Sequence, residues 1–456
     1  MDSVDYRLTE GAIVKKLLKL TLPIMGTSFL QMAYNLTDMF WIGFMGSKAV
    51  AALGIAGFFS WLSMAFVLIS RVGTEIRVAQ LIGGNQDDEA RIIARTGVQL
   101  TAVMGIVFAI AIYVFRYPLI GFFNTQDAQV ERMSIVYLSI ICIGFIGVFL
   151  NQVFTGLFNA VGNSRTPFVF NTIGLILNMV LDPMLILGFG KIPSMGVKGA
   201  AIATVFAQLS VMILFVVAIL ARQMLMKHFT ILGLPKLSHL IEITRMGVPP
   251  AVQSGIFTII SMIIARLIAD FGPTPVAVQK VGSQIESISW MTASGFSVAL
   301  SAFVGQNFGA GKRDRVYEGY KKAMQIAIAL GVFTTVLLYV GARPLFMIFI
   351  REPDAIAYGI DYLKILALSQ LFMCVEITAS GIFNGLGHTK PPAFIGVCFN
   401  ILRIPMAFWF TNYFGWGING IWWSITISSV LKGIVAYYWL QRILRKTQIA
   451  ASVHLS

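Results

Sequence analysis

The chain has 456 residues, of which 57% are hydrophobic and 12% are charged. Soluble proteins are about a quarter charged, so this composition excludes an ordinary soluble globular protein and indicates that lipid surrounds most of the chain. The formal net charge of +14 does not indicate a nucleic-acid partner, because the positive residues follow the loop pattern of a membrane protein, as shown below.

Apolar segments long enough to cross a bilayer follow one another along the chain. A spanning helix needs about 20 mostly apolar residues, and each span must be helical because lipid offers no hydrogen-bond partner to the backbone. We therefore predict an all-α membrane protein with about twelve transmembrane helices. The predicted spans lie near residues 17–43, 51–73, 96–115, 133–158, 168–189, 197–220, 247–270, 281–305, 323–342, 362–385, 393–414 and 418–440.

Lysine and arginine residues are distributed unevenly between alternate loops. With the N-terminus inside, about 21 of the 34 Lys and Arg residues fall on the cytoplasmic side and about 9 on the opposite side. Cytoplasmic loops carry this excess in multi-pass proteins, so we expect both termini in the cytoplasm and the protein in the cell (inner) membrane. The cytoplasmic set includes Lys15, Lys16, Lys19, Arg222, Lys227, Lys236, Arg245, Lys312, Arg313, Arg315, Lys321 and Lys322.

The two halves of the sequence repeat one another. Pro23 in LTLPIMG corresponds to Pro249 in MGVPPAV, and the segment TGLFNAVGNSRTP at 155–167 corresponds to SGIFNGLGHTKPP at 380–392. Such internal similarity is the signature of a duplicated fold. Further matching pairs are Gln80 and Gln306, Gly83 and Gly309, Asn178 and Asn400, and Pro183 and Pro405.

The repeat defines the predicted domain organisation. Each half has six spans, an even number, so the halves are parallel repeats related by a pseudo-two-fold axis along the membrane normal. We predict an N-terminal six-helix lobe at 1–220, a cytoplasmic linker at 221–246 and a C-terminal six-helix lobe at 247–456. Two such lobes are typical of secondary transporters that work by alternating access.

Four polar side chains fall at similar depth in three spans of the first half. Asp38 lies in the outer half of the first span, Asn178 and Asp182 lie one turn apart on the fifth, and Thr204 lies on the sixth. Residues at i and i+4 share a helix face, and ionisable groups in a span cost about 2.5–3.5 kcal/mol each. We therefore predict a proton or cation site, although hydrogen bonding between helices is an alternative role for the two aspartates.

The chain resembles the multidrug and toxic compound extrusion (MATE) family over nearly its whole length, and its DinF-like branch in particular. The residues that carry the resemblance are Gln31, Tyr34 and Asp38 in the first span, Asn178, Asp182 and Pro183 in the fifth, GVKGAAIAT ending at Thr204, and VGQNFGAG after Phe303.

The resemblance implies an H⁺- or Na⁺-coupled antiporter that exports varied, often cationic or aromatic, compounds. Asp38 and Asp182 would be the coupling carboxylates, and the ligands of Na⁺ if it is the coupling ion, with Asn178 and Thr204 beside them. By the same resemblance, the substrate cavity would be lined by Gln31, Tyr34 and Asn35, and the first helix would bend at Pro23.

The second half departs from the NorM-like branch of this family. That branch has a carboxylate about eight residues after the proline corresponding to Pro249, and this chain has Phe257 there. Glu286 and Glu376 are instead the acidic residues inside spans of this half. Both could be a second polar site, but pairing with Arg266 or Arg403 is the interpretation that we favour.

Other sources of energy and other activities are not indicated. The segment GQNFGAGKRD fails as a P-loop, because Gln306 and Arg313 stand where that motif needs Gly and Ser or Thr. No nucleophile–base pair or metal-binding histidine pair is visible, so we expect neither an enzyme nor a cofactor. We expect a monomer in the lipid bilayer. A lipid-linked saccharide flippase or a narrow-specificity metabolite exporter remains the alternative function.

Overall fold

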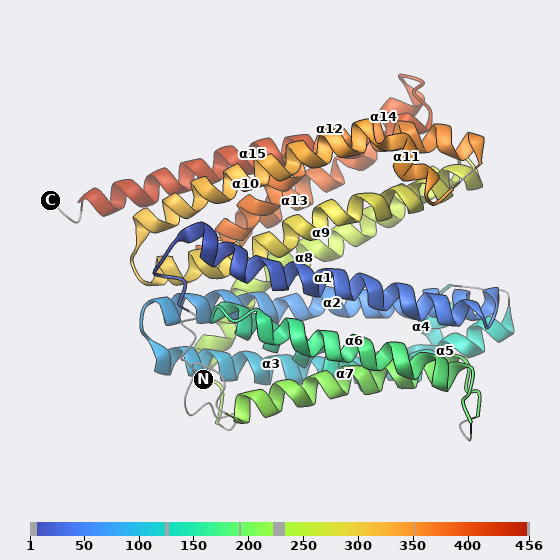
Figure 1. The fold of residues 1–456 in the computed structure, drawn as a ribbon, viewed down its shortest axis with the longest axis horizontal. Coiled ribbons are helices and arrows are strands. Elements are labelled where there is room, and N and C mark those ends of the chain that lie inside the picture. The colour runs from blue at the N-terminus through green and yellow to red at the C-terminus, as the bar shows by residue number, and fades with distance from the viewer. Residues whose placement is uncertain (1–6, 124–126, 191–192, 222–232, 351, 454–456) are drawn as a thin grey trace. The chain divides into compact units, whose positions relative to one another are not determined.

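The computed structural model describes residues 7–123, 127–190, 193–221, 233–350 and 352–453. Within these residues the regular structure consists of fifteen helices, labelled α1 to α15 (Figure 1). The prediction of an all-α protein is confirmed.

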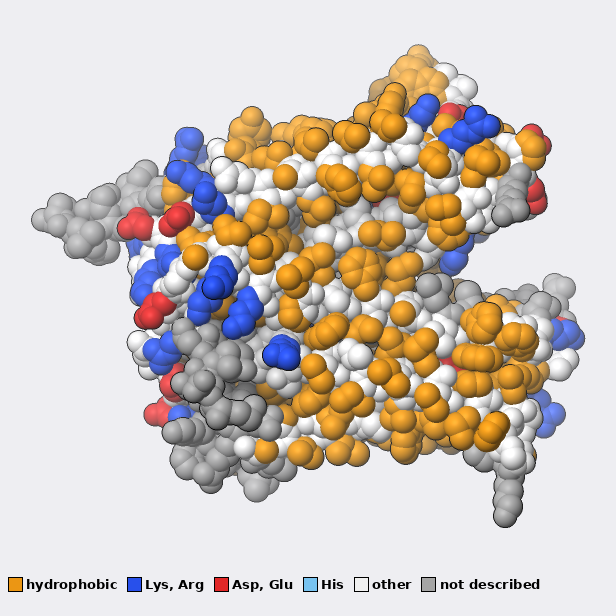
Figure 2. Space-filling model, viewed as in Figure 1, with side chains coloured by type: hydrophobic (Ala, Val, Ile, Leu, Met, Phe, Trp, Pro, Cys, Tyr) orange, Lys and Arg blue, Asp and Glu red, His pale blue; other side chains and the backbone are white. Residues whose placement is uncertain are grey.

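Most of these helices have the length and composition of membrane spans. Among the described residues, eleven helical segments are long and apolar enough to cross a bilayer, with α13 and α14 counted as one. α1 (Ile13–Gly43) adds a helix of 31 residues with the length of a span. The total agrees with the predicted number. Figure 2 shows hydrophobic side chains along the helices and most charged side chains near helix ends.

The chain forms two compact units. Unit 1 comprises Met1–Arg7 and Leu22–Ala251, and unit 2 comprises Leu8–Thr21 and Val252–Ser456.

In unit 1, α5 is the central helix and packs against α2, α3 and α7. Its aromatic side chains supply much of the core: Phe145, Phe149, Phe154 and Phe158 are buried, and Phe215 of α7 lies against the last two with ring centroids 5.7 Å apart in each pair. α6 packs against α7, and α4 lies beside α5. Its helices are α2 (Ser47–Gly83), α3 (Asp87–Val114), α4 (Arg116–Gly121), α5 (Ala128–Ala160), α6 (Arg165–Ile186) and α7 (Val197–Leu220).

In unit 2, α12 has the corresponding central place and packs against α9, α10 and α15. Tyr362 of α12 and Trp422 of α15 are buried edge to face, with ring centroids 5.3 Å apart. The helices are α8 (Leu237–Ala269, from Val252), α9 (Pro273–Gly309), α10 (Arg313–Val340), α11 (Ala342–Met347), α12 (Pro353–Gly385), α13 (Lys390–Ile401), α14 (Arg403–Asn412) and α15 (Ile418–Val453).

The unit boundaries fall inside helices rather than in a linker. α1 passes from unit 2 to unit 1 beside Pro23, and α8 passes from unit 1 to unit 2 beside Pro249 and Pro250. Of the linker expected at 221–246, residues 222–232 lie outside the described residues, and α8 already begins at Leu237. A hydropathy criterion detects only the apolar part of a helix and misses the polar residues at its ends. The helices therefore extend beyond the apolar segments that predict them.

One predicted span is divided in two. The segment expected as a single helix at 393–414 consists of α13 and α14, with an interruption at Leu402. Pro405 has no N–H to donate to the carbonyl of Ile401, four residues earlier, which accounts for a break at this place.

Candidate coupling site and pocket of unit 1

The four polar side chains predicted as a cation site lie together in unit 1. Asn178 and Asp182 of α6 are fully buried, and the Asn178 Nδ2 donates a hydrogen bond of 3.2 Å to the Asp182 Oδ1. Asp38 of α1 interacts electrostatically with Asp182 and with the side chains of Asn178 and Thr204 of α7. Three helices therefore bring two carboxylates, an amide and a hydroxyl to one place.

Two tyrosines complete this group. Tyr34 of α1 is 8% exposed and Tyr137 of α5 is 7% exposed, and both interact electrostatically with Asp38 and Asp182. Tyr137 did not emerge from the sequence, because it stands in an apolar segment and no motif marks it. Tyr137 comes close to the carboxylates only through the tertiary packing of α5.

Several side-chain oxygen atoms of the site have no hydrogen-bond partner among the described residues. Five buried side-chain oxygens make no hydrogen bond with the described residues, and they are Tyr34 Oη, Asp38 Oδ1, Asn178 Oδ1, Asp182 Oδ2 and Thr204 Oγ1. Buried polar atoms are rarely left without a partner. Oxygen donors of this kind suit a proton or a small hard cation.

Ligands for a softer metal are absent from the described residues, where no group of three His, Cys, Asp or Glu side chains is found. The donor set of two carboxylates and neutral oxygens therefore fits a transported proton or Na⁺ better than a resident transition metal.

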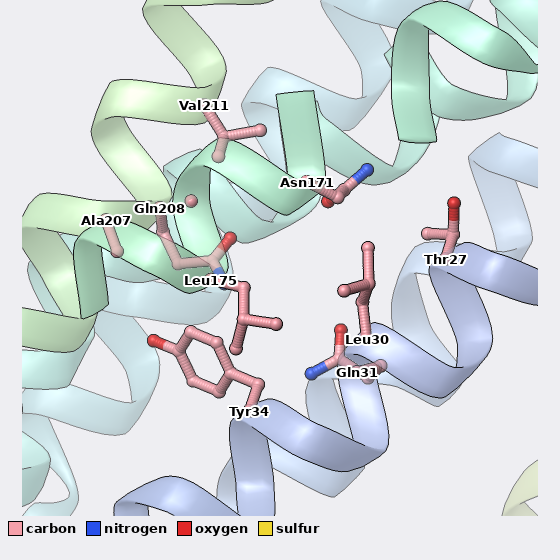
Figure 3. A pocket seen from close by; sticks show the side chains of 10 residues that line it. Thr27, Leu30, Gln31, Tyr34, Asn171, Leu175, Ala207, Gln208 and Val211 are labelled. Carbon is pink, nitrogen blue, oxygen red and sulfur yellow. The ribbon is translucent and has the colours of Figure 1, made fainter. Parts of the chain in front are cut away.

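A small pocket lies next to this site (Figure 3). Its volume is about 30 Å³, which is room for about two water molecules. Gln31 and Tyr34 from α1 line it together with residues of α6 and α7, and their place in a substrate cavity stays a prediction. Tyr34 belongs to both the pocket and the carboxylate group. The other lining residues are Thr27, Leu30, Asn171, Gly174, Leu175, Ala207, Gln208 and Val211.

Two further predictions concern α1. The side chain of Asn35, expected in the substrate cavity, lies outside the described residues. Pro23, expected to permit a bend, stands inside α1, and the Thr27 Oγ1 donates a hydrogen bond of 3.0 Å to the Pro23 carbonyl. α1 continues through Pro23, which has no N–H to donate to the carbonyl of Lys19, and the bend stays a prediction.

The two acidic residues of unit 2 differ in their partners. Glu376 of α12 forms an ion pair with Lys432 of α15, with 3.3 Å between the Oε2 and the Nζ. Glu286 of α9 accepts hydrogen bonds from the Gln370 Nε2 at 2.8 Å and from the Tyr362 hydroxyl at 3.4 Å. The arginine pairing favoured from the sequence is not what the described residues show, because helix rotation brings Lys432 rather than an arginine to Glu376.

Two bundles of long apolar helices, one with two carboxylates beside a pocket, define a multi-pass membrane protein. The MatE family model matches residues 23–184 and 249–409, one match in each half of the sequence. The chain belongs to the MatE family, the multidrug and toxic compound extrusion transporters. The DinF-like branch stays a prediction.

Similar proteins cover nearly the whole chain. A probable multidrug resistance protein NorM of Thermotoga maritima is 28% identical over 411 residues, which are 90% of this chain and 88% of the relative. An FAD transporter of Shewanella oneidensis is 24% identical over 449 residues, covering 96% of each chain.

Solved structures of the family share the fold. A MATE transporter crystallised in a bent conformation matches with a TM-score of 0.91 at 21% identity, covering 99% of this chain and 100% of that chain. A crystal structure of MATE in the straight conformation matches with a TM-score of 0.90 at 21% identity, covering 98% of this chain and 100% of that chain.

Proposed function

We propose that the protein exports structurally varied, often cationic or aromatic compounds in exchange for H⁺ or Na⁺, by alternating access. The observation that carries this proposal is the pair of carboxylates Asp38, which is half-buried, and Asp182, which is fully buried, beside neutral oxygens without other partners among the described residues. The relative named as a multidrug resistance protein supports the same class of substrate.

The arrangement suggests how ion and substrate compete. A proton or Na⁺ bound between the Asp38 and Asp182 oxygens neutralises charge in the place where a cationic substrate would gain most from it. Loading of the ion would then release the substrate.

The energy of such an exchange is sufficient. One charge crossing 100 mV releases about 2.3 kcal/mol, and one pH unit adds about 1.4 kcal/mol. The sum of about 3.7 kcal/mol supports a gradient of several hundredfold for a neutral substrate.

We further propose that the protein works as a monomer in the inner membrane with both termini in the cytoplasm. The excess of Lys and Arg in alternate loops supports this orientation. Accessibility of single cysteines introduced at the two ends of each span tests it, since labelling of either terminus from outside intact cells would contradict it.

Proteoliposomes test the transport function directly. An inward-directed H⁺ or Na⁺ gradient, each imposed separately, should drive export of the cationic dye rhodamine 6G by the intact protein. Asp38→Asn and Asp182→Asn should each abolish gradient-driven export while leaving a folded protein, judged by its elution profile. Wild-type rates in both variants would refute the assignment of the carboxylates.

A narrow-specificity metabolite exporter is the second candidate, because one relative is named as an FAD transporter. FAD export from loaded vesicles, measured by flavin fluorescence, separates the two. Export of FAD without export of any dye would favour this candidate.

A further inference from the structure

We propose that unit 2 contains a second recognition site with the opposite charge, in which Arg403 binds a carboxylate group of transported compounds. This inference rests on the proposed export function and adds a substrate class to it. Arg403 is the first residue of α14 and is only 8% exposed. A charged side chain inside a membrane span costs free energy, and such residues commonly mark a substrate or ion pathway.

The direct partners of Arg403 are neutral. Its Nε donates a hydrogen bond of 2.7 Å to the Ser428 Oγ, and its Nη2 donates one of 3.2 Å to the Ser429 Oγ, both on α15. Among the described residues, no carboxylate oxygen lies within 4.0 Å of the guanidinium. Hydroxyl groups satisfy two of its five N–H donors but do not compensate its charge.

The nearby carboxylates are engaged elsewhere. Glu376 is paired with Lys432 at 3.3 Å, and Glu286 accepts hydrogen bonds from Gln370 and Tyr362. Both glutamates act on Arg403 only at longer range. The guanidinium fork therefore keeps donors for a planar, bidentate anion such as a carboxylate, the group whose geometry it matches best.

An aromatic surface lies beside the guanidinium. The Arg403 Cζ is 5.9 Å from the centre of the Phe257 ring, and Phe257 is 44% exposed. A flat compound that carries a carboxylate could place its ring against Phe257 and its anionic group on Arg403. Phe257 occupies the position that is acidic in the NorM-like branch, so an aromatic ring and a nearby cation lie where that branch has an acid.

The repeat makes the contrast between the halves clear. Asp182 directly precedes Pro183 in α6, and Arg403 stands two residues before Pro405, the matching proline in α14. In this alignment Ile404 is the counterpart of Asp182 and Leu181 is the counterpart of Arg403, so the second half lacks the acid and has an arginine one residue earlier.

The competing explanation is a purely structural role, in which the hydrogen bonds of Arg403 to Ser428 and Ser429 hold α14 against α15. Two matched dyes and three variants separate these roles in proteoliposomes. Rhodamine 6G is a cationic ethyl ester, and rhodamine 19 is the corresponding free acid with the same ring system. The intact protein should export both.

Arg403→Gln should lower kcat/KM for the free acid about tenfold or more and change that for the ester by less than about twofold. The variant Ser428→Ala/Ser429→Ala removes the two hydrogen bonds between α14 and α15 but keeps the guanidinium. The ratio of kcat/KM for the free acid to kcat/KM for the ester should therefore stay within about twofold of the wild-type ratio. Arg266→Gln, which removes an exposed arginine of α8, is the charge-matched control and should change neither dye.

Equal losses for both dyes in Arg403→Gln would overturn the proposal, as would wild-type export of the ester without export of the free acid. Absence of export for both dyes in the wild type would instead refute the export function itself. Should Arg403→Gln fail to fold, Arg403→Lys keeps the charge but loses the planar fork. A loss confined to the free acid in that variant supports the proposal, and an equal or absent loss overturns it.

Discussion

Arg77 of α2 and Glu242 of α8 form an ion pair, with 2.7 Å between the Arg77 Nε and the Glu242 Oε1. The two helices come from different halves of the sequence, yet both residues belong to unit 1. Their side chains are 28% and 30% exposed, so water screens the attraction in part.

Exchanging the two charges in a double variant should restore the thermal stability that each single substitution removes. Arg77→Glu and Glu242→Arg place like charges together and should each lower the melting temperature, whereas the double variant recovers most of the loss. We expect a coupling energy of about 0.2–1 kcal/mol, as for partly exposed pairs. Thermal unfolding of the four proteins measures it, and additive losses would show that the pair contributes nothing.

The crossing of α2 and α8 beside this pair depends on two glycines. A Cβ at Gly247 would collide with the backbone carbonyl of Ile69, and one at Gly73 would collide with that of Ile243. Gly247→Val should therefore destabilise the protein by about 1–3 kcal/mol, the usual cost of overpacking. Gly255→Val in the same helix is the control, because nothing lies within 4 Å of its added Cβ. Equal melting temperatures for the two variants would contradict the close crossing.

Thr204 tests whether neutral oxygens help to bind the coupling ion. Thr204→Val keeps the shape and removes an oxygen that makes no other hydrogen bond among the described residues. The ion concentration for half-maximal dye export should rise about tenfold, because the ion loses one oxygen ligand that is worth about one hydrogen bond to a charged group. Thr172→Val in α6 is the control, because the Thr172 hydroxyl bonds the Phe168 carbonyl of its own helix at 2.7 Å. An unchanged half-maximal concentration in Thr204→Val would exclude the hydroxyl as a ligand.

Asp127, before the first turn of α5, gives a stability prediction that depends on pH. The hydrogen bond from Lys48, followed by that from the Gln129 N–H, lowers the pKa of this carboxyl below its ordinary value. A lowered pKa in the folded state means that stabilisation is complete above the unfolded pKa of about 3.9 and is lost as the pH falls through the folded value. Asp127→Ala should therefore lower the melting temperature at neutral pH.

The difference in melting temperature between Asp127→Ala and the intact protein should narrow steadily as the pH is lowered below about 4. Lys48→Met removes the partner of the 2.8 Å ion pair and should shift the onset of this narrowing to higher pH. A difference that does not vary with pH would mean that the carboxylate charge plays no part.

The sequence by itself determined the transmembrane helices, the duplication and four polar residues of the unit 1 site. Hydropathy over a window of about 20 residues is a local property, and the depth of a residue follows from its place in a span. Asp38, Asn178, Asp182 and Thr204 could therefore be grouped by depth alone, and the structure places them together.

Only the tertiary structure decided which side chains meet. Tyr137 joins the carboxylates, Lys432 rather than an arginine pairs with Glu376, and α8 begins within unit 1. These outcomes depend on the rotation and tilt of each helix about its axis, which side-chain packing against several distant segments sets. An apolar segment records that a helix crosses the membrane but carries little information on which neighbour each of its faces meets.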